Sequence, residues 1–140
     1  MQPFLDSTEI THRALELQER MAREGYLFIR GLVPPSMLET LRLQMLGIAR
    51  DAGWVTHDSP LETGVANLDE FCVEPEPEYM QVYQRFYSLE EFHAVQHHPA
   101  LLELVERIAG EPVMPHPRII GRIIFPQREA YTTPAHQDFV

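Results

Sequence analysis

The pattern of apolar residues changes at Gly110, and this change constrains the fold more than any other feature of the chain. Before Gly110, apolar side chains recur with the spacing of amphipathic α-helices. After Gly110, residues 118–125 are rich in β-branched side chains and are too short a run for a helix. The sequence therefore predicts an α+β domain in which helices come first and strands follow.

Capping residues and glycines predict where these elements begin and end. Asp6 is the expected N-cap of the first helix, and Gly25 fits the position just after its end. The expected helices are 6–25, 36–53, 88–97 and 99–110, and the expected strands are 26–30, 112–116, 118–125 and 135 onward. Residues 74–78 alternate glutamate with proline and are expected to form an extended, solvated loop.

Composition narrows the class of protein and the kind of partner. The chain has 140 residues, 44% of them hydrophobic, and a net charge of −10. This charge argues against nucleic acid as the main partner, because phosphate binders need clustered Lys and Arg. A single cysteine, Cys72, cannot form an internal disulfide. Neither a signal peptide nor an apolar run of transmembrane length is visible, so we expect a cytoplasmic protein with no membrane partner.

The tripeptide His136-Gln137-Asp138 carries the most specific chemistry. On an extended strand, residues i and i+2 point to the same side, which places an imidazole and a carboxylate together. These are two of the three ligands in the 2-His-1-carboxylate triad of non-haem Fe(II) oxygenases. The alternative is an ordinary histidine and aspartate on the surface near a chain end.

Arg122 is the second candidate. It stands among isoleucines 14 residues before His136. If both segments pack in one barrel, Arg122 can face the same cavity and bind an anionic cosubstrate. The alternative is an arginine that faces solvent on an edge strand.

The order of these segments resembles the phytanoyl-CoA dioxygenase family of iron(II)- and 2-oxoglutarate-dependent oxygenases. The resemblance rests on Gly25-Tyr26-Leu27 with the helix after it, on the stretch from His98-Pro99 to Gly110, and on the strand leading into Thr133-Pro134-Ala135-His136-Gln137-Asp138-Phe139. It implies that His136 and Asp138 are iron ligands and that Arg122 lies on a strand lining the 2-oxoglutarate pocket. Gln81 falls near the position where some members place a cosubstrate-binding lysine.

Together with the pattern change at Gly110, the resemblance predicts a partial double-stranded β-helix, a jelly-roll or cupin-like barrel with flanking N-terminal helices. Residues 1–140 would be the N-terminal portion of one oxygenase domain. The third ligand, a distal His, and the Arg that grips 2-oxoglutarate would then lie beyond Val140, and the 140 residues alone would be inactive.

The implied reaction is hydroxylation of a small organic substrate at a C–H bond by molecular oxygen, with decarboxylation of 2-oxoglutarate to succinate and CO2. Two alternatives stay open: a non-catalytic interaction domain that keeps the fold, and a metal-binding barrel with redox-neutral chemistry.

Overall fold

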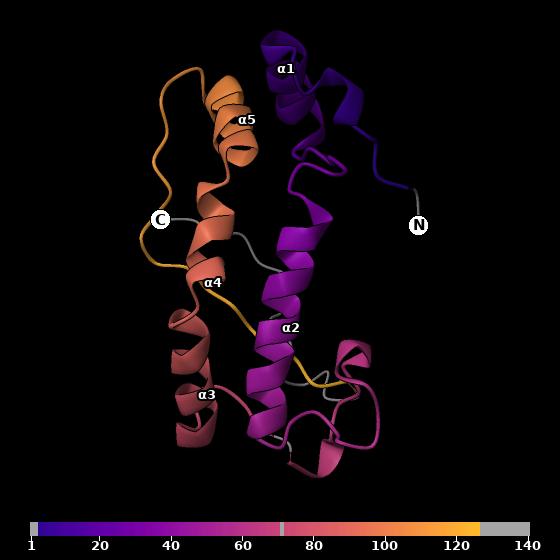
Figure 1. Ribbon diagram of the computed structural model, residues 1–140. Coiled ribbons are helices and arrows are strands. Elements are labelled where there is room, and N and C mark those ends of the chain that lie inside the picture. The colour runs from indigo at the N-terminus through magenta and orange to yellow at the C-terminus, as the bar shows by residue number, and fades with distance from the viewer. Residues whose placement is uncertain (1–2, 71, 127–140) are drawn as a thin grey trace. The chain divides into compact units, whose positions relative to one another are not determined.

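The computed structural model describes residues 3–70 and 72–126 (Figure 1). Its α-helices are α1 Ala14–Glu24, α2 Pro35–Asp51, α3 Pro77–Tyr87, α4 Glu90–Ala94 and α5 Pro99–Ala109. Its 3-10 helices are η1 Thr8–Ile10, η2 Leu61–Thr63, η3 Leu68–Glu70 and η4 Val95–His97. The chain forms two compact units: the first comprises Met1–Thr40 and Glu90–Ile119, the second Leu41–Leu89 and Ile120–Val140.

The first unit is built on the contact between α1 and α5, which lie side by side in Figure 1. Its buried core consists of Ile10, Leu17 and Leu104. The side chain of Gln18 on α1 donates to the carbonyl oxygens of Arg107 and Ile108 at 3.1 and 3.2 Å. These carbonyls belong to the last turn of α5, where backbone acceptors lack helical partners, so Gln18 caps α5 from a neighbouring helix.

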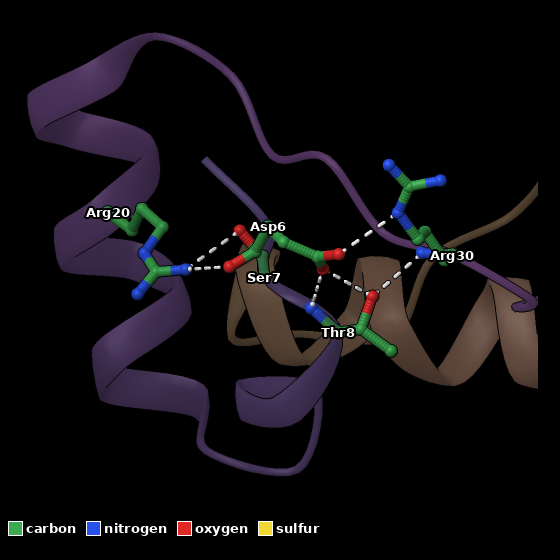
Figure 2. A network of polar contacts seen from close by, with 5 residues as sticks. All are labelled: Asp6, Ser7, Thr8, Arg20 and Arg30. Carbon is green, nitrogen blue, oxygen red and sulfur yellow. Dashed lines mark hydrogen bonds and ion pairs between the residues drawn. The ribbon is translucent and has the colours of Figure 1, made fainter. Parts of the chain in front are cut away.

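A network of polar contacts holds the N-terminal segment in the first unit (Figure 2). The Asp6 carboxylate accepts hydrogen bonds from the backbone and hydroxyl of Thr8 at 2.8 and 2.6 Å and pairs with Arg30 at 3.1 Å. Arg20 donates to the Asp6 carbonyl and to the hydroxyl of the buried Ser7. The Ser7 amide in turn donates to the carbonyl of Phe28 at 2.7 Å. We call residues 6–8 with these two arginines the N-terminal clasp.

The second unit has a core dominated by aromatic rings. Trp54 stacks on Tyr79 with ring centroids 5.4 Å apart and meets Phe125 edge to face at 5.6 Å. All three side chains are at most 4% exposed. The remaining buried members are Ala49, Val55, Val82 and Phe86. This core therefore joins the end of α2, one face of α3 and the segment that follows residue 119 within one unit.

Most predicted helices are confirmed. α2 begins at Pro35 and is followed by Gly53, and α5 begins at Pro99 and ends before Gly110, whose φ of 78° is the left-handed value that favours glycine. The expected helix 88–97 is divided into α4 and η4, and the helix expected from Asp6 begins as η1 and becomes α1 only at Ala14. No helix among the described residues is long and apolar enough to cross a membrane.

Residues 74–78 were expected to form an extended loop, and this prediction was wrong for residues 77 and 78, which are helical. Pro77 is the first residue of α3, a position that proline tolerates because the first helical N–H has no partner in any case. The buried positions Tyr79, Val82 and Phe86 follow at helical spacing.

The predicted β-structure is wrong wherever the structure describes it, while the strand expected from residue 135 lies outside the described residues. The described residues contain no strand, only two isolated bridges, Asp6 with Phe28 and Val55 with Ala66, so the partial double-stranded β-helix is not observed. Residues 112–116 and 118–125 are neither helical nor paired into a sheet. The physical reason is that helix hydrogen bonds are local, whereas a strand also needs a second backbone beside it. β-Branched composition favours an extended chain but does not supply that partner.

Candidate functional site

The four residues predicted for the site fall into two groups. His136 and Asp138, the expected metal ligands, lie outside the described residues. Arg122 and Gln81, the expected cosubstrate contacts, are both described and both belong to the second unit. The structure therefore describes the segment that leads toward the expected ligands and the surroundings of the two cosubstrate candidates.

Residues 120–125, which we call the extended segment, alternate between outward and inward positions. Ile120, Arg122 and Ile124 are exposed, whereas Ile123 is half-buried and Phe125 is 4% exposed. This is the period-two alternation of an extended chain, although no strand pairs with it among the described residues. The inward face is apolar, and the outward face carries the one charged side chain of the segment.

The side chain of Tyr79 on α3 binds the backbone of the extended segment. Its hydroxyl accepts from the Ile123 amide at 3.3 Å and donates to the Ile123 carbonyl at 3.5 Å. One phenol thus serves both backbone groups of a residue that has no sheet partner in the described part of the chain. Burial of the ring raises the pKa of Tyr79, so the phenol keeps the proton that it donates.

A second tyrosine on the same face of α3 adds to this arrangement. The Tyr83 and Tyr87 hydroxyls lie 3.2 Å apart, and their rings meet edge to face at 4.9 Å. Burial and the Tyr87 hydroxyl raise the pKa of Tyr83 to about 12. The Tyr83 phenol is therefore neutral at physiological pH and acts as a hydrogen-bonding and packing group.

Arg122 forms an ion pair with Glu74, the residue at the start of the Glu-Pro loop. The Arg122 Nη2 and Glu74 Oε2 atoms are 2.8 Å apart, and the two side chains are 39% and 47% exposed. This pairing raises the pKa of Arg122. The guanidinium stays charged and half-exposed, with a carboxylate already beside it.

Gln81 lies on the exposed side of α3 and lines a hollow of about 290 Å³. Its described lining comprises Ala52, Trp54, Glu78, Gln81, Val82 and Arg85. Arg85 also pairs with Asp51 at 2.7 Å. Arg122 is not in this lining, so the structure does not bring the two cosubstrate candidates together in one hollow.

Other possible ligands do not gather elsewhere in residues 3–70 and 72–126. No group of three His, Cys, Asp or Glu side chains in this part of the chain is placed to hold a metal ion. Burial and the nearby Glu76 and Glu78 raise the pKa of Cys72 to about 11, which keeps this thiol protonated.

Sequence reasoning missed Tyr79 and Glu74 as the residues that hold the extended segment. Glu74 was interpreted as a solvated loop carboxylate, and its partner Arg122 lies 48 positions later. No local pattern links residues so far apart. Tyr79 had a usable signal, since it begins a helically spaced apolar series after Pro77.

Comparison with known proteins identifies the family. A family model described as phytanoyl-CoA dioxygenase (PhyH) matches residues 21–140. The chain belongs to the phytanoyl-CoA dioxygenase family. Neither the curated proteins nor the solved structures gave a significant match. The family is one of dioxygenases, and its matched region includes the second unit, the part of the first unit from residue 21 onward, and the His136-Gln137-Asp138 tripeptide.

Proposed function

We propose that this protein is an Fe(II)- and 2-oxoglutarate-dependent dioxygenase. It would hydroxylate a small organic substrate at a C–H bond with molecular oxygen and convert 2-oxoglutarate to succinate and CO2. One observation carries the proposal: the family match runs through residue 140 and so covers His136 and Asp138. Their imidazole and carboxylate are ligand types of the Fe(II) facial triad.

The donor chemistry of this tripeptide fits the metal. A neutral imidazole and a carboxylate are suited to Fe(II), and the i, i+2 spacing lets both reach one ion from an extended backbone. In this proposal His136 and Asp138 hold the iron. When bound, the iron supplies the activation of oxygen, and the protein supplies binding, orientation and electrostatics.

Arg122 is proposed to bind the anionic cosubstrate. A guanidinium presents five N–H donors in a planar fork, which matches a carboxylate in two-pronged geometry. Glu74 already accepts from one of these nitrogens at 2.8 Å. Ion pairs as exposed as this one are weak, so a dicarboxylate can compete with Glu74 for the guanidinium.

Gln81 is proposed as a second, separate contact to the cosubstrate. Its amide can donate to a carboxylate and accept from a hydroxyl, but it carries no charge. Arg85 also lines this hollow, and its guanidinium pairs with Asp51 at 2.7 Å. The contributions of Arg122 and Gln81 therefore need independent tests.

The decisive experiment uses the protein as its gene encodes it, with any residues that follow Val140. We expect Fe(II)-dependent consumption of 2-oxoglutarate, with succinate and CO2 formed in equal amounts. His136→Ala and Asp138→Ala should each remove this activity. A redox-neutral metal protein would bind the ion and form no succinate, and a non-catalytic interaction domain would show neither property.

A further inference from the structure

A second hollow in the second unit differs in character from the one beside Gln81. It has a volume of about 170 Å³ and lies where the end of α2, the loop after η2 and the extended segment meet. Its walls include Leu46, Ala66, Trp54 and Phe125. None of the lining residues in the described part of the chain carries a charged side chain. This hollow can therefore offer contact area but no side-chain charge to a ligand.

The size of the hollow selects the kind of ligand. An apolar cavity of roughly 150 Å³ in a protein interior stays dry and binds benzene or xenon. At about 170 Å³, the present hollow is slightly larger than that. A single six-membered ring or a branched group of five or six carbons fits such a space.

The walls also favour a ring. Two aromatic side chains, Trp54 and Phe125, line the hollow, and a ligand ring can pack on such side chains stacked or edge to face. Aromatic ligands gain from both arrangements beyond the area that they bury. The indole is held from behind by its stacking on Tyr79 with centroids 5.4 Å apart, so this wall is fixed before a ligand arrives.

The family match connects the hollow with the expected reaction. Ile123, Ile124 and Phe125 line the hollow, and the match that covers His136 and Asp138 covers these residues too. We propose that this hollow is a binding site for a small, uncharged, ring-sized apolar group. The identity of this group rests on the proposed function: it is the apolar end of the organic substrate.

The test uses iodobenzene as a probe and needs neither iron nor 2-oxoglutarate. Trp54 is the single tryptophan of residues 1–140 and lines the hollow, so the part of the emission that Trp54→Phe removes reports on this site. The heavy iodine atom quenches indole emission on contact. We expect quenching that saturates with iodobenzene concentration and is reversed by added benzene.

Two substitutions and one matched control locate the site. Ala66→Leu fills the hollow and should weaken iodobenzene binding at least tenfold, which is about 1.4 kcal/mol. Ile124→Asp places a carboxylate at a lining position that is 51% exposed, so the fold tolerates it while apolar binding falls by about fivefold or more. Ile120→Asp makes the same change on the same segment at a 73% exposed position outside the lining, and binding should change less than about twofold.

Each outcome decides the proposal. Saturable quenching that Ala66→Leu or Ile124→Asp weakens and Ile120→Asp preserves supports it. Quenching that rises linearly without saturation, or equally in all variants, overturns it, as does absence of quenching because another part of the protein fills the hollow. Saturable binding in a protein that makes no succinate would refute the proposed function alone, and succinate formation without saturable binding would refute the hollow alone.

Discussion

The two compact units hold their extended parts in different ways. In the first unit, the N-terminal segment is fastened mainly by polar contacts, with Asp6 at the centre and the Arg30 and Asp6 side chains 71% and 47% exposed. In the second unit, the extended segment is fastened by the buried ring of Phe125 and by the Tyr79 hydroxyl. The first arrangement depends on charge at the surface, the second on apolar burial.

This difference predicts different stabilities. Exposed ion pairs contribute about 0–1 kcal/mol and are screened by salt. A fully buried aromatic side chain contributes several kcal/mol, and its loss leaves a cavity. We therefore expect the extended segment to stay fixed under conditions that release the N-terminal clasp. Substitutions in the two units and at the proposed site test this contrast, and the largest effect is expected at the site.

The largest effect is expected from the proposed metal ligands. Asp138→Ala should lower 2-oxoglutarate turnover at least about a hundredfold, because residues that merely support metal ligands already cost 10–100-fold when replaced. Asp6→Ala, a carboxylate lost from the clasp instead, should leave turnover within about twofold. Succinate formation by the whole encoded protein measures both, and an active Asp138→Ala variant would contradict the metal assignment.

The aromatic core supplies the next largest effect. Phe125→Ala should lower the free energy of unfolding by about 3–5 kcal/mol, because it removes a ring that is 4% exposed. Ile124→Ala, one residue earlier and 51% exposed, should cost less than about 1 kcal/mol. Urea unfolding followed by Trp54 emission tests the pair, and equal losses would show that Phe125 does not hold the segment.

Arg122 gives a smaller, functional effect. A charge-assisted contact contributes about 1.5–3 kcal/mol, so Arg122→Ala should raise the 2-oxoglutarate concentration needed for half-maximal rate roughly ten- to a hundredfold. Glu74→Gln removes the competing carboxylate, and this requirement should stay the same or fall. If Arg122→Ala leaves the requirement unchanged, Arg122 serves only its ion pair with Glu74.

Two tyrosine hydroxyls allow a direct comparison of the units. Tyr79→Phe leaves the Ile123 backbone groups without their phenol partner, and we expect a loss of about 0.5–1.5 kcal/mol together with faster amide exchange at Ile123. Tyr26→Phe removes the acceptor of the exposed Leu5 amide, which water can replace, so stability should barely change. Equal losses would remove the distinction between the units.

The smallest effect is the pH dependence of the clasp. Hydrogen bonds from Thr8, and then the contact with Arg30, lower the pKa of Asp6 below its ordinary value of 3.8. The clasp contribution is therefore complete above pH 3.8 and is lost as the pH falls through the lowered pKa. Amide exchange at Ser7 should accelerate over that range, and Asp6→Asn should abolish the step. A pH step that persists in this variant would point to another group.

Capping and end signals predicted α2 and α5 correctly, whereas α3 was not predicted. Pro99 and Gly110 bound α5, and Pro35 begins α2, because the preferences of proline and glycine at helix ends act within a few residues. The start of α1 was less predictable. Asp6 does bind the Thr8 amide as a cap does, yet the helix breaks after η1 and begins again at Ala14.

Long-range partners were beyond the reach of local patterns. Arg122 was expected at a cosubstrate and is paired with Glu74, and Tyr79 serves a backbone 44 positions later. The predicted strands failed for the same reason, since composition specifies an extended chain but not a neighbour for it.

Near neighbours along the chain were enough to predict the ends of α2 and α5, the spacing of apolar faces, and an imidazole and a carboxylate two positions apart at residues 136 and 138. The contact between the Tyr79 hydroxyl and Ile123 became visible only in the tertiary structure, where no second strand lies beside Ile123 among the described residues. The same holds for the apolar hollow that Trp54 and Phe125 line. The physical reason is the range of the forces involved. Helix hydrogen bonds and caps act over a few residues, whereas burial depends on which distant segments meet.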